Sequence, residues 1–383
     1  MALCLLVAHT FPPMLGGSAA VYAALARCAK GEIAVLTSRR DHRTGAERLG
    51  WREADEEAPY PVHRLRLVRP PLASGPAASI SWAPRAALLA AAVTHLAHRH
   101  RVRAVCVADD ETVGWLVPFV RRVLGLRALA YCHGDDLVQT DPRAIARRAR
   151  HLAAAHAVVA ASAFAARRLA EGYGVARDRI VLIPNGINLD HYRPGPPDAA
   201  LAAALGVAGS RVVLAATRLV PRKGVDRLIA ALPTVLAAVP QTQLLIAGDG
   251  PQRAELENQA RGLPVRFLGA VPAERMPDLY RLAEVVALPN REEPGEVDGM
   301  PMTLLEAQAC GRVVVAGRAG GAPEAVADGE TGLVVDGEDT AAIAAALIRA
   351  LTDRSLAARL IPNPIDQNRC AQSRSPMDMM RPG

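Results

Sequence analysis

Short apolar runs alternate along this chain with longer stretches in which apolar and polar residues mix at helical spacing. In the first half, this pattern predicts buried strands at residues 3–8, 33–37, 62–68, 104–108, 126–132, 157–161 and 180–183. It predicts helices at residues 19–30, 86–98, 113–124, 144–154 and 163–171, whereas residues 39–61 look polar and irregular. Repeated strand–helix units of this kind favour a parallel sheet covered by helices.

The same alternation resumes after a break at residues 184–197, which are rich in proline, glycine and asparagine. Further strands are expected at residues 212–216, 244–247, 265–268, 285–288 and 313–316, and helices at 225–239, 302–310 and 340–351. We therefore expect an α/β fold with domains at 1–183 and 198–360, joined by a linker at 184–197. The tail at 361–383 has several prolines and little apolar periodicity, so it is expected to be disordered.

Composition agrees with a globular protein of two ordinary domains, since the chain has 383 residues and about half of them are apolar. No apolar run approaches the ~20 residues that a membrane span needs, and the N-terminal run is interpreted as a first strand, not a signal peptide. The six cysteines are scattered without a C-x-x-C pair, which is typical of reduced core cysteines. These features predict a cytoplasmic protein.

Charge is distributed unevenly. Residues 1–200 hold 26 lysine and arginine residues against 17 acidic ones, whereas residues 201–383 hold 19 against 21. A basic first half can contact an anionic acceptor or the inner face of a membrane, and the alternative is a solvated arginine-rich surface.

Two cations lie in an expected strand-to-helix loop of the second half. Arg218 and Lys223 follow the strand at 212–216, and such a loop can neutralise a diphosphate, with arginine as a planar fork and lysine as a point charge. The chain has only two lysines, Lys30 and Lys223, so a lysine at this place is itself informative.

Residues 291–321 combine an acidic Pro/Gly loop with a short apolar helix. Asp298 ends the loop side, Glu306 lies on the helix, and Gly311 stands where a helix would end in a left-handed residue. A loop that leads into a helix start can seat an anionic or hydroxyl-rich ligand, and the alternative is an acidic surface loop.

Two places in the first half also suggest ligand contacts. Gly16 and Gly17 precede a helix that Ser18 is expected to cap, so backbone N–H groups there can approach a ligand. His133 follows directly on a predicted strand, at the edge where ligands bind in parallel sheets. Asp135 and Asp136 come next, but two adjacent acids without a third ligand do not predict a metal site.

The stretch from Asp298 to Gly311 reads D-G-M-P-M-T-L-L-E-A-Q-A-C-G. It resembles the E-x7-E signature of retaining glycosyltransferases of family 4, with Asp298 where the family usually has glutamate. The R-x4-K-G of Arg218 and Lys223, the H-G at His133, and the segments P-N-G-I-N-x-D-x-Y-x-P, G-D-G-P and F-L-G-x-V occur in the family's order, so the resemblance covers residues 3–360.

The resemblance implies a GT-B fold, with two Rossmann-like domains facing a central cleft, and sugar transfer from a nucleoside diphosphate sugar to an acceptor hydroxyl. It implies retention of anomeric configuration, no metal and no cofactor. The expected diphosphate contacts are Arg218, Lys223 and the backbone at Gly16 and Gly17. Other expected donor contacts are Glu306 on the ribose, Asp298 and His133 on the sugar, and Gly248, Gly250, Val271 and Met302 around the nucleotide.

Two alternatives stay open. A nucleotide-sugar epimerase can share the fold, although it needs additional acid and base carboxylates that the sequence does not reveal. An inactive nucleotide-sugar-binding protein is the other, because the tail departs from the family. The acceptor is expected to be a lipid-linked or polysaccharide molecule of bacterial glycolipid or polysaccharide biosynthesis, with no role for nucleic acid.

Overall fold

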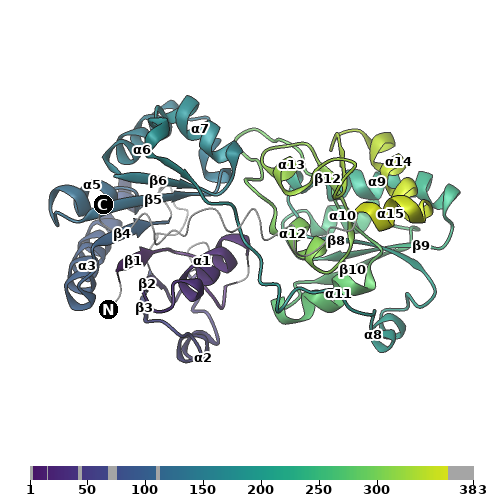
Figure 1. The fold of residues 1–383 in the computed structure, drawn as a ribbon, viewed down its shortest axis with the longest axis horizontal. Coiled ribbons are helices and arrows are strands. Elements are labelled where there is room, and N and C mark those ends of the chain that lie inside the picture. The colour runs from purple at the N-terminus through teal and green to yellow at the C-terminus, as the bar shows by residue number, and fades with distance from the viewer. Residues whose placement is uncertain (1–2, 15, 42–44, 68–75, 109–112, 361–383) are drawn as a thin grey trace. The chain divides into compact units, whose positions relative to one another are not determined.

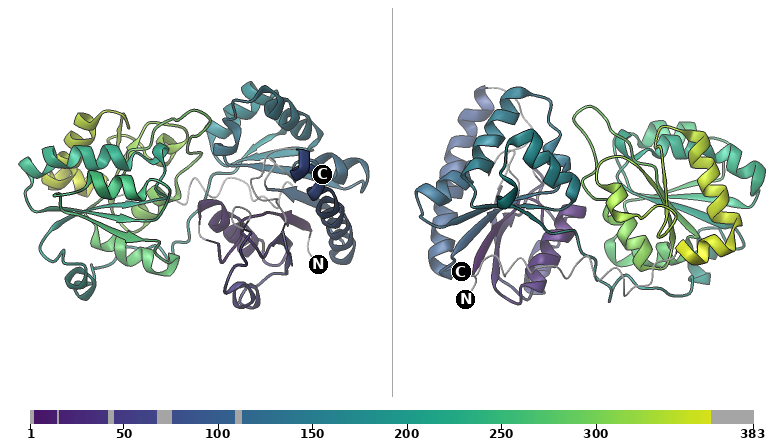
Figure 2. Two further views of the ribbon diagram at one scale, coloured as in Figure 1. Left: turned by 180° about the vertical axis from the view of Figure 1, so that it is seen from behind. Right: turned by 45° about the horizontal axis from the view of Figure 1, so that its top comes forward.

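The computed structural model describes residues 3–14, 16–41, 45–67, 76–108 and 113–360. The tail at 361–383, expected to be disordered, lies outside the described residues. The chain divides into two compact units between Gly186 and Ile187, within the segment 184–197. Each unit is an α/β domain with a parallel sheet, as Figures 1 and 2 show.

The first unit has strand order β3-β2-β1-β4-β5-β6-β7. Its strands are β1 (Cys4–Val7), β2 (Ile33–Ser38), β3 (Val62–Leu65), β4 (Ala104–Val107), β5 (Arg127–Cys132), β6 (Ala157–Ala160) and β7 (Ile180–Leu182). Its helices include α1 (Gly17–Cys28), α2 (Trp51–Glu56), α3 (Pro76–His100), α5 (Leu116–Arg122), α6 (Pro142–Ala154) and α7 (Ala163–Tyr173), with short 3₁₀ turns η1 (Asp135–Leu137) and η2 (Arg177–Arg179).

The second unit has strand order β10-β9-β8-β11-β12-β13. Its strands are β8 (Arg211–Ala216), β9 (Thr242–Ala247), β10 (Val265–Gly269), β11 (Val285–Leu288), β12 (Val313–Gly317) and β13 (Leu333–Val335). Its helices include α8 (Ala199–Ala204), α9 (Val225–Ala238), α10 (Arg253–Gln259), α11 (Met276–Leu282), α12 (Met302–Ala309), α13 (Ala322–Ala325), α14 (Thr340–Thr352) and α15 (Arg354–Leu360), with 3₁₀ turns η3 (Pro221–Lys223) and η4 (Ala273–Arg275).

Alternating residues of the second sheet enter two separate cores. On one face, Val213, Ala215 and their neighbours pack with α9 and α14. On the other face, Val212 and Leu214 pack with residues of α11 and α12. Both faces of the sheet are therefore buried, which explains why its strands read as continuous apolar runs.

Most predicted elements are confirmed, including the left-handed backbone of Gly311 with φ 72° after α12. The expected cap at Ser18 is wrong, because α1 begins at Gly17 and its N-cap residue is Gly16, without a side-chain cap. The irregular interpretation of residues 39–61 missed α2. That helix has no buried residue, and Arg64 of β3 pairs with its Asp55 at 2.7 Å, a contact that no local pattern reveals.

Candidate active site

The strand order of the second unit reverses direction between β8 and β11. From β8 the chain goes on to β9 and β10, whereas β12 and β13 lie beyond β11. In open parallel sheets, ligands bind at such a switch point, beyond the carboxyl ends of the strands. The loops that follow β8 and β11 carry three of the predicted site residues, Arg218, Lys223 and Asp298.

Lys223 and Asp298 form an ion pair at this switch point. Lys223 Nζ lies 2.8 Å from Asp298 Oδ1, and the same oxygen accepts a hydrogen bond from Arg222 Nε at 3.1 Å. The side chains are well buried, with 13% of Lys223 and 5% of Asp298 exposed. Asp298 Oδ2 is buried and has no hydrogen-bond partner among the described residues. The carboxylate therefore fixes two cations through one oxygen and keeps acceptor capacity on the other.

Glu306 lies in a different environment, on α12. Tyr280 of α11 donates its hydroxyl hydrogen to Glu306 Oε2 at 2.6 Å, and Tyr192 also bonds the carboxylate. Burial raises the pKa of Glu306, against the lowering effect of the two tyrosine hydroxyls. Sequence reasoning missed both tyrosines, although Tyr192 is the tyrosine of the P-N-G-I-N-x-D-x-Y-x-P segment and could have been found there.

His133 belongs to the first unit, where it meets α1. Tyr22 of α1 donates its hydroxyl hydrogen to the Ala108 carbonyl at 2.7 Å, and its oxygen lies 2.8 Å from His133 Nε2. Because that hydroxyl has one hydrogen to give, His133 Nε2 must be the donor and carry a proton. β1 and β4 flank the switch point of this sheet, so the contact from α1 to Ala108 spans it.

Other predicted residues of the first unit lie as follows. Gly16 and Gly17 are exposed at the start of α1. Asp136 Oδ1 accepts hydrogen bonds from the backbone N–H groups of His133 and Gly134, at 3.1 and 2.8 Å. This carboxylate therefore shapes the turn after β5, and no group of three metal-ligating side chains occurs in the part of the chain that the structure describes.

Comparisons with known proteins give the family. A model described as Glycosyl transferases group 1 matches residues 210–353, and the model Glycosyltransferase Family 4 matches residues 15–191. A GDP-mannose-dependent alpha-(1-6)-phosphatidylinositol monomannoside mannosyltransferase of Mycolicibacterium smegmatis is 34% identical over 366 residues, which cover 93% of this chain and 91% of the relative. The chain belongs to the group 1 glycosyltransferases.

A further sequence relative and a solved structure agree with this family assignment. A D-inositol 3-phosphate glycosyltransferase of Nocardia farcinica is 37% identical over 267 residues, covering 64% of this chain and 56% of the relative. The crystal structure of HepE from Anabaena, in complex with UDP and glucose, superposes with a TM-score of 0.75 at 22% identity, covering 98% of this chain and 96% of that one. The second likeness shows the GT-B fold alone.

The remaining predicted donor residues of the glycosyltransferase lie in the loops after β8, β9 and β10 and at the start of α12. A Cβ atom on Gly248 would come within 1.8 Å of the Thr217 carbonyl oxygen, and one on Gly250 within 2.3 Å of the Leu219 oxygen. Close backbone packing between the loops after β8 and β9 therefore accounts for both glycines. Arg218 is exposed in the loop after β8, Val271 is half-buried against one core, and Met302 begins α12. Their donor contacts stay predictions.

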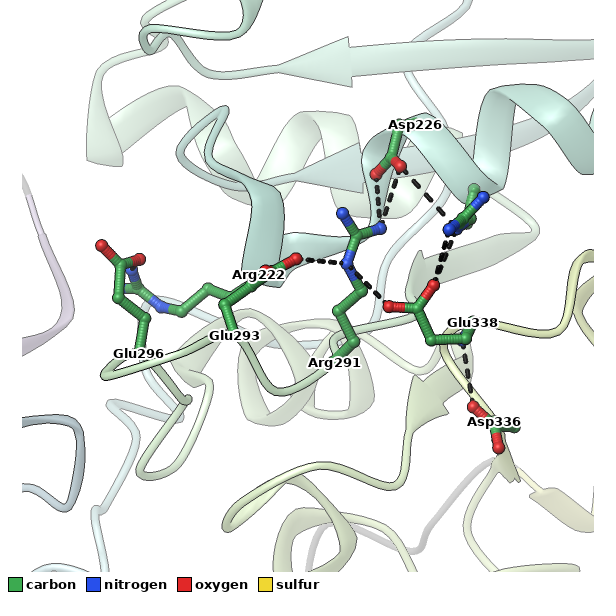
Figure 3. A network of polar contacts seen from close by, with 8 residues as sticks. Arg222, Asp226, Arg291, Glu293, Glu296, Asp336 and Glu338 are labelled. Carbon is green, nitrogen blue, oxygen red and sulfur yellow. Dashed lines mark hydrogen bonds and ion pairs between the residues drawn. The ribbon is translucent and has the colours of Figure 1, made fainter. Parts of the chain in front are cut away.

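A larger ionic network lies next to the loop after β8, which carries Arg218, Arg222 and Lys223 and is called the cation loop (Figure 3). Arg291 bonds both carboxylate oxygens of Asp226, at 2.8 and 2.9 Å, and also reaches Glu293 at 2.8 Å and Glu338 at 3.2 Å. Its backbone N–H donates to the Arg222 carbonyl at 2.8 Å. Burial acts to lower the pKa of Arg291, but the bonds to Glu293 and Asp226 raise it overall. Arg291 thus ties the loop after β11 to the turn that carries Lys223.

Proposed function

We propose that this glycosyltransferase moves mannose from GDP-mannose to a hydroxyl of a phosphatidylinositol-containing glycolipid. The activity of the relatives that match nearly the whole chain supports this choice of donor and acceptor. The observation that carries the proposal is the Lys223–Asp298 pair at the switch point of the second sheet, because it offers a cation and a free carboxylate oxygen together.

The chemistry follows from these charges. The acceptor hydroxyl oxygen bonds the anomeric carbon while the bond from that carbon to the diphosphate breaks, and the hydroxyl proton passes to the leaving diphosphate. Negative charge builds on the diphosphate in this step, and Lys223 and Arg218 stabilise it electrostatically. Asp298 Oδ2 accepts a hydrogen bond from a sugar hydroxyl, since Oδ1 already binds the two cations. Glu306 accepts hydrogen bonds from the ribose hydroxyls through the carboxylate lone pairs that Tyr280 and Tyr192 do not occupy.

We further propose that transfer retains anomeric configuration and needs neither metal nor cofactor. Fixed cations take over the charge compensation that a divalent ion supplies in other transferases. His133, whose Nε2 proton is held by Tyr22, contributes a sugar contact from the first unit. No covalent nucleophile is required, because the acceptor attacks the face from which the diphosphate leaves.

The place of action in this proposal is the cytoplasm, at the inner face of the membrane, where a glycolipid acceptor would be met. The excess of basic residues in the first half supports peripheral attraction to anionic lipid. Among the helices that the structure describes, none is long and apolar enough to cross a bilayer.

The test is a transfer assay read by mass spectrometry. The purified full chain receives GDP-mannose, UDP-glucose or ADP-glucose, with and without a phosphatidylinositol mannoside in detergent and with EDTA. Of the three donors, only GDP-mannose should add one mannose to the acceptor. NMR of the product should show that the mannose keeps the anomeric configuration it has in the donor. Conversion of the free donor to an epimer would overturn the proposal, as would binding of donors without turnover.

A further inference from the structure

Two arginines of the first unit face each other across the turn that follows β2. Arg40 and Glu47 form an antiparallel bridge, and the Arg48 N–H donates to the Arg39 carbonyl at 3.0 Å. In an antiparallel pair, the residues beside a bridge lie directly opposite and project to the same face, so Arg39 and Arg48 share one face. Like charges directly opposite each other destabilise a strand pair. This arrangement therefore calls for a compensating group.

The protein itself supplies little compensation. The buried Nε atoms of Arg39 and Arg48 have no hydrogen-bond partner among the described residues, and neither side chain forms an ion pair within that part of the chain. The terminal nitrogens of Arg48 only reach the carbonyls of His9 and Phe11, both at 3.5 Å, the outer limit of a hydrogen bond.

The neighbouring Arg64, in comparison, has its charge balanced by a direct ion pair. It bonds Asp55 through two nitrogens and is only 2% exposed. For Arg48, in contrast, burial lowers the pKa; the charge of Asp41 opposes this effect, and the nearby Arg64 adds to it. Arg48 is thus a partly buried cation that feels the charge of Asp41 but has no direct ion pair among the described residues.

A third donor lies on the segment of backbone that Arg48 reaches. Thr10 stands between the two residues whose carbonyls Arg48 reaches, and its hydroxyl is buried without a hydrogen-bond partner among the described residues. Thr10 belongs to the loop that leads from β1 to α1, at the carboxyl edge of the sheet. That edge is where parallel sheets bind ligands.

We propose that Arg39, Arg48 and Thr10 bind a phosphate group of the acceptor. The inference rests on the proposed function and names one chemical requirement of its acceptor. Two guanidinium groups and a hydroxyl offer several N–H and O–H donors to one tetrahedral oxyanion, and phosphate is the anion that arginine forks match best. The donor diphosphate has its own cations, Arg218 and Lys223, on the other unit. The phosphate can come from a lipid phosphodiester or from a soluble phosphorylated polyol.

Thermal unfolding with inorganic phosphate tests the subsite without any turnover. We expect phosphate to raise the melting temperature of the wild-type chain. Arg39→Gln should reduce that rise and, because it removes a like-charge pair, should melt higher than the wild type in phosphate-free buffer. Arg103→Gln, which removes an exposed arginine at the opposite edge of the same sheet, is the matched control and should behave as the wild type. Equal phosphate shifts in Arg39→Gln and the wild type would overturn the proposal.

Transfer kinetics then identify the source of the phosphate. Three acceptors are compared: a phosphatidylinositol mannoside in micelles, myo-inositol phosphate, and a mannosyl inositol without phosphate. One of the two phosphorylated acceptors should be the better substrate. For that acceptor, Arg48→Gln and Arg39→Gln should each raise the acceptor KM about tenfold or more, the effect of losing one charge-assisted hydrogen bond. The KM for the donor should stay unchanged.

The outcomes separate this inference from the proposed function. If the wild type transfers sugar and the variants keep its acceptor KM, the phosphate subsite is wrong while the proposed function stands. Equal use of the acceptor without phosphate would also refute it. If the wild type transfers no sugar at all, the proposed function fails, and the phosphate-induced melting shift still decides whether the subsite binds phosphate.

Discussion

Replacing Lys223 by methionine tests the cation loop most directly. Lys223→Met keeps most of the side-chain volume and removes the ammonium group that lies 2.8 Å from Asp298 Oδ1. A charge-assisted hydrogen bond to a diphosphate oxygen contributes about 1.5–3 kcal/mol, so the Kd for GDP should rise about 10- to 150-fold. The fold should survive, because Asp298 keeps its bond to Arg222 at 3.1 Å and is not left as an uncompensated buried charge.

Isothermal titration calorimetry with GDP measures this change. The chain supplies its own control, since Lys30 is its other lysine and lies exposed just beyond α1 in the first unit. Lys30→Met should leave the Kd for GDP unchanged. If Lys223→Met stays folded and binds GDP within twofold of the wild type, the assignment of Lys223 to the diphosphate is refuted.

Three further substitutions examine the rest of the site. Asp298→Asn should leave GDP affinity undiminished but lower kcat/KM for the sugar donor, and an equal loss in both measurements would contradict the division of labour between its oxygens. Glu306 has a raised pKa in the folded state, so it binds more protons there than in the unfolded chain, and its contribution to stability falls as pH rises above about 4.5. Urea unfolding from pH 4 to 7 should therefore show Glu306→Gln gaining stability relative to the wild type as pH rises, and a constant difference would argue against it. Gly250→Ala should destabilise the fold by at least about 1 kcal/mol, because its Cβ would lie 2.3 Å from the Leu219 oxygen, whereas Gly172→Ala in α7, with open space around it, should stabilise by about 0.4–1 kcal/mol in the same urea assay.

The fold was largely predictable from the sequence. Its strands are buried on both faces, so each appears as an apolar run, and the helices between them keep an amphipathic spacing. The left-handed Gly311 could be placed because only the local chain decides where α12 ends. Several short helices were missed, and α2 is one example, since an ion pair from β3 stabilises it.

The site was predictable only as far as local motifs reach. Arg218, Lys223, Asp298 and Glu306 stand in recognisable loops, but the partners of the two acids come from elsewhere. Arg222 precedes Asp298 by 76 positions, and Tyr280 precedes Glu306 by 26. Such pairings depend on which strands become neighbours in the sheet, and residue spacing along the chain does not contain that information.

The way in which Asp298 binds Lys223 and Arg222 also affects how fast a nucleotide arrives. Arg222 also pairs with Glu296 at 2.8 Å, so two cations face two carboxylates, and such a neutral group acts at a distance as dipoles, whose field fades much faster than that of a lone charge. The network in Figure 3 adds no excess of positive charge, since Arg291 contacts Asp226, Glu293 and Glu338. The second unit therefore exerts little long-range pull on polyanions, and its association rate with GDP should vary only weakly with ionic strength. Abundant cellular polyphosphates are then not concentrated at its surface, and discrimination among nucleotides occurs at contact.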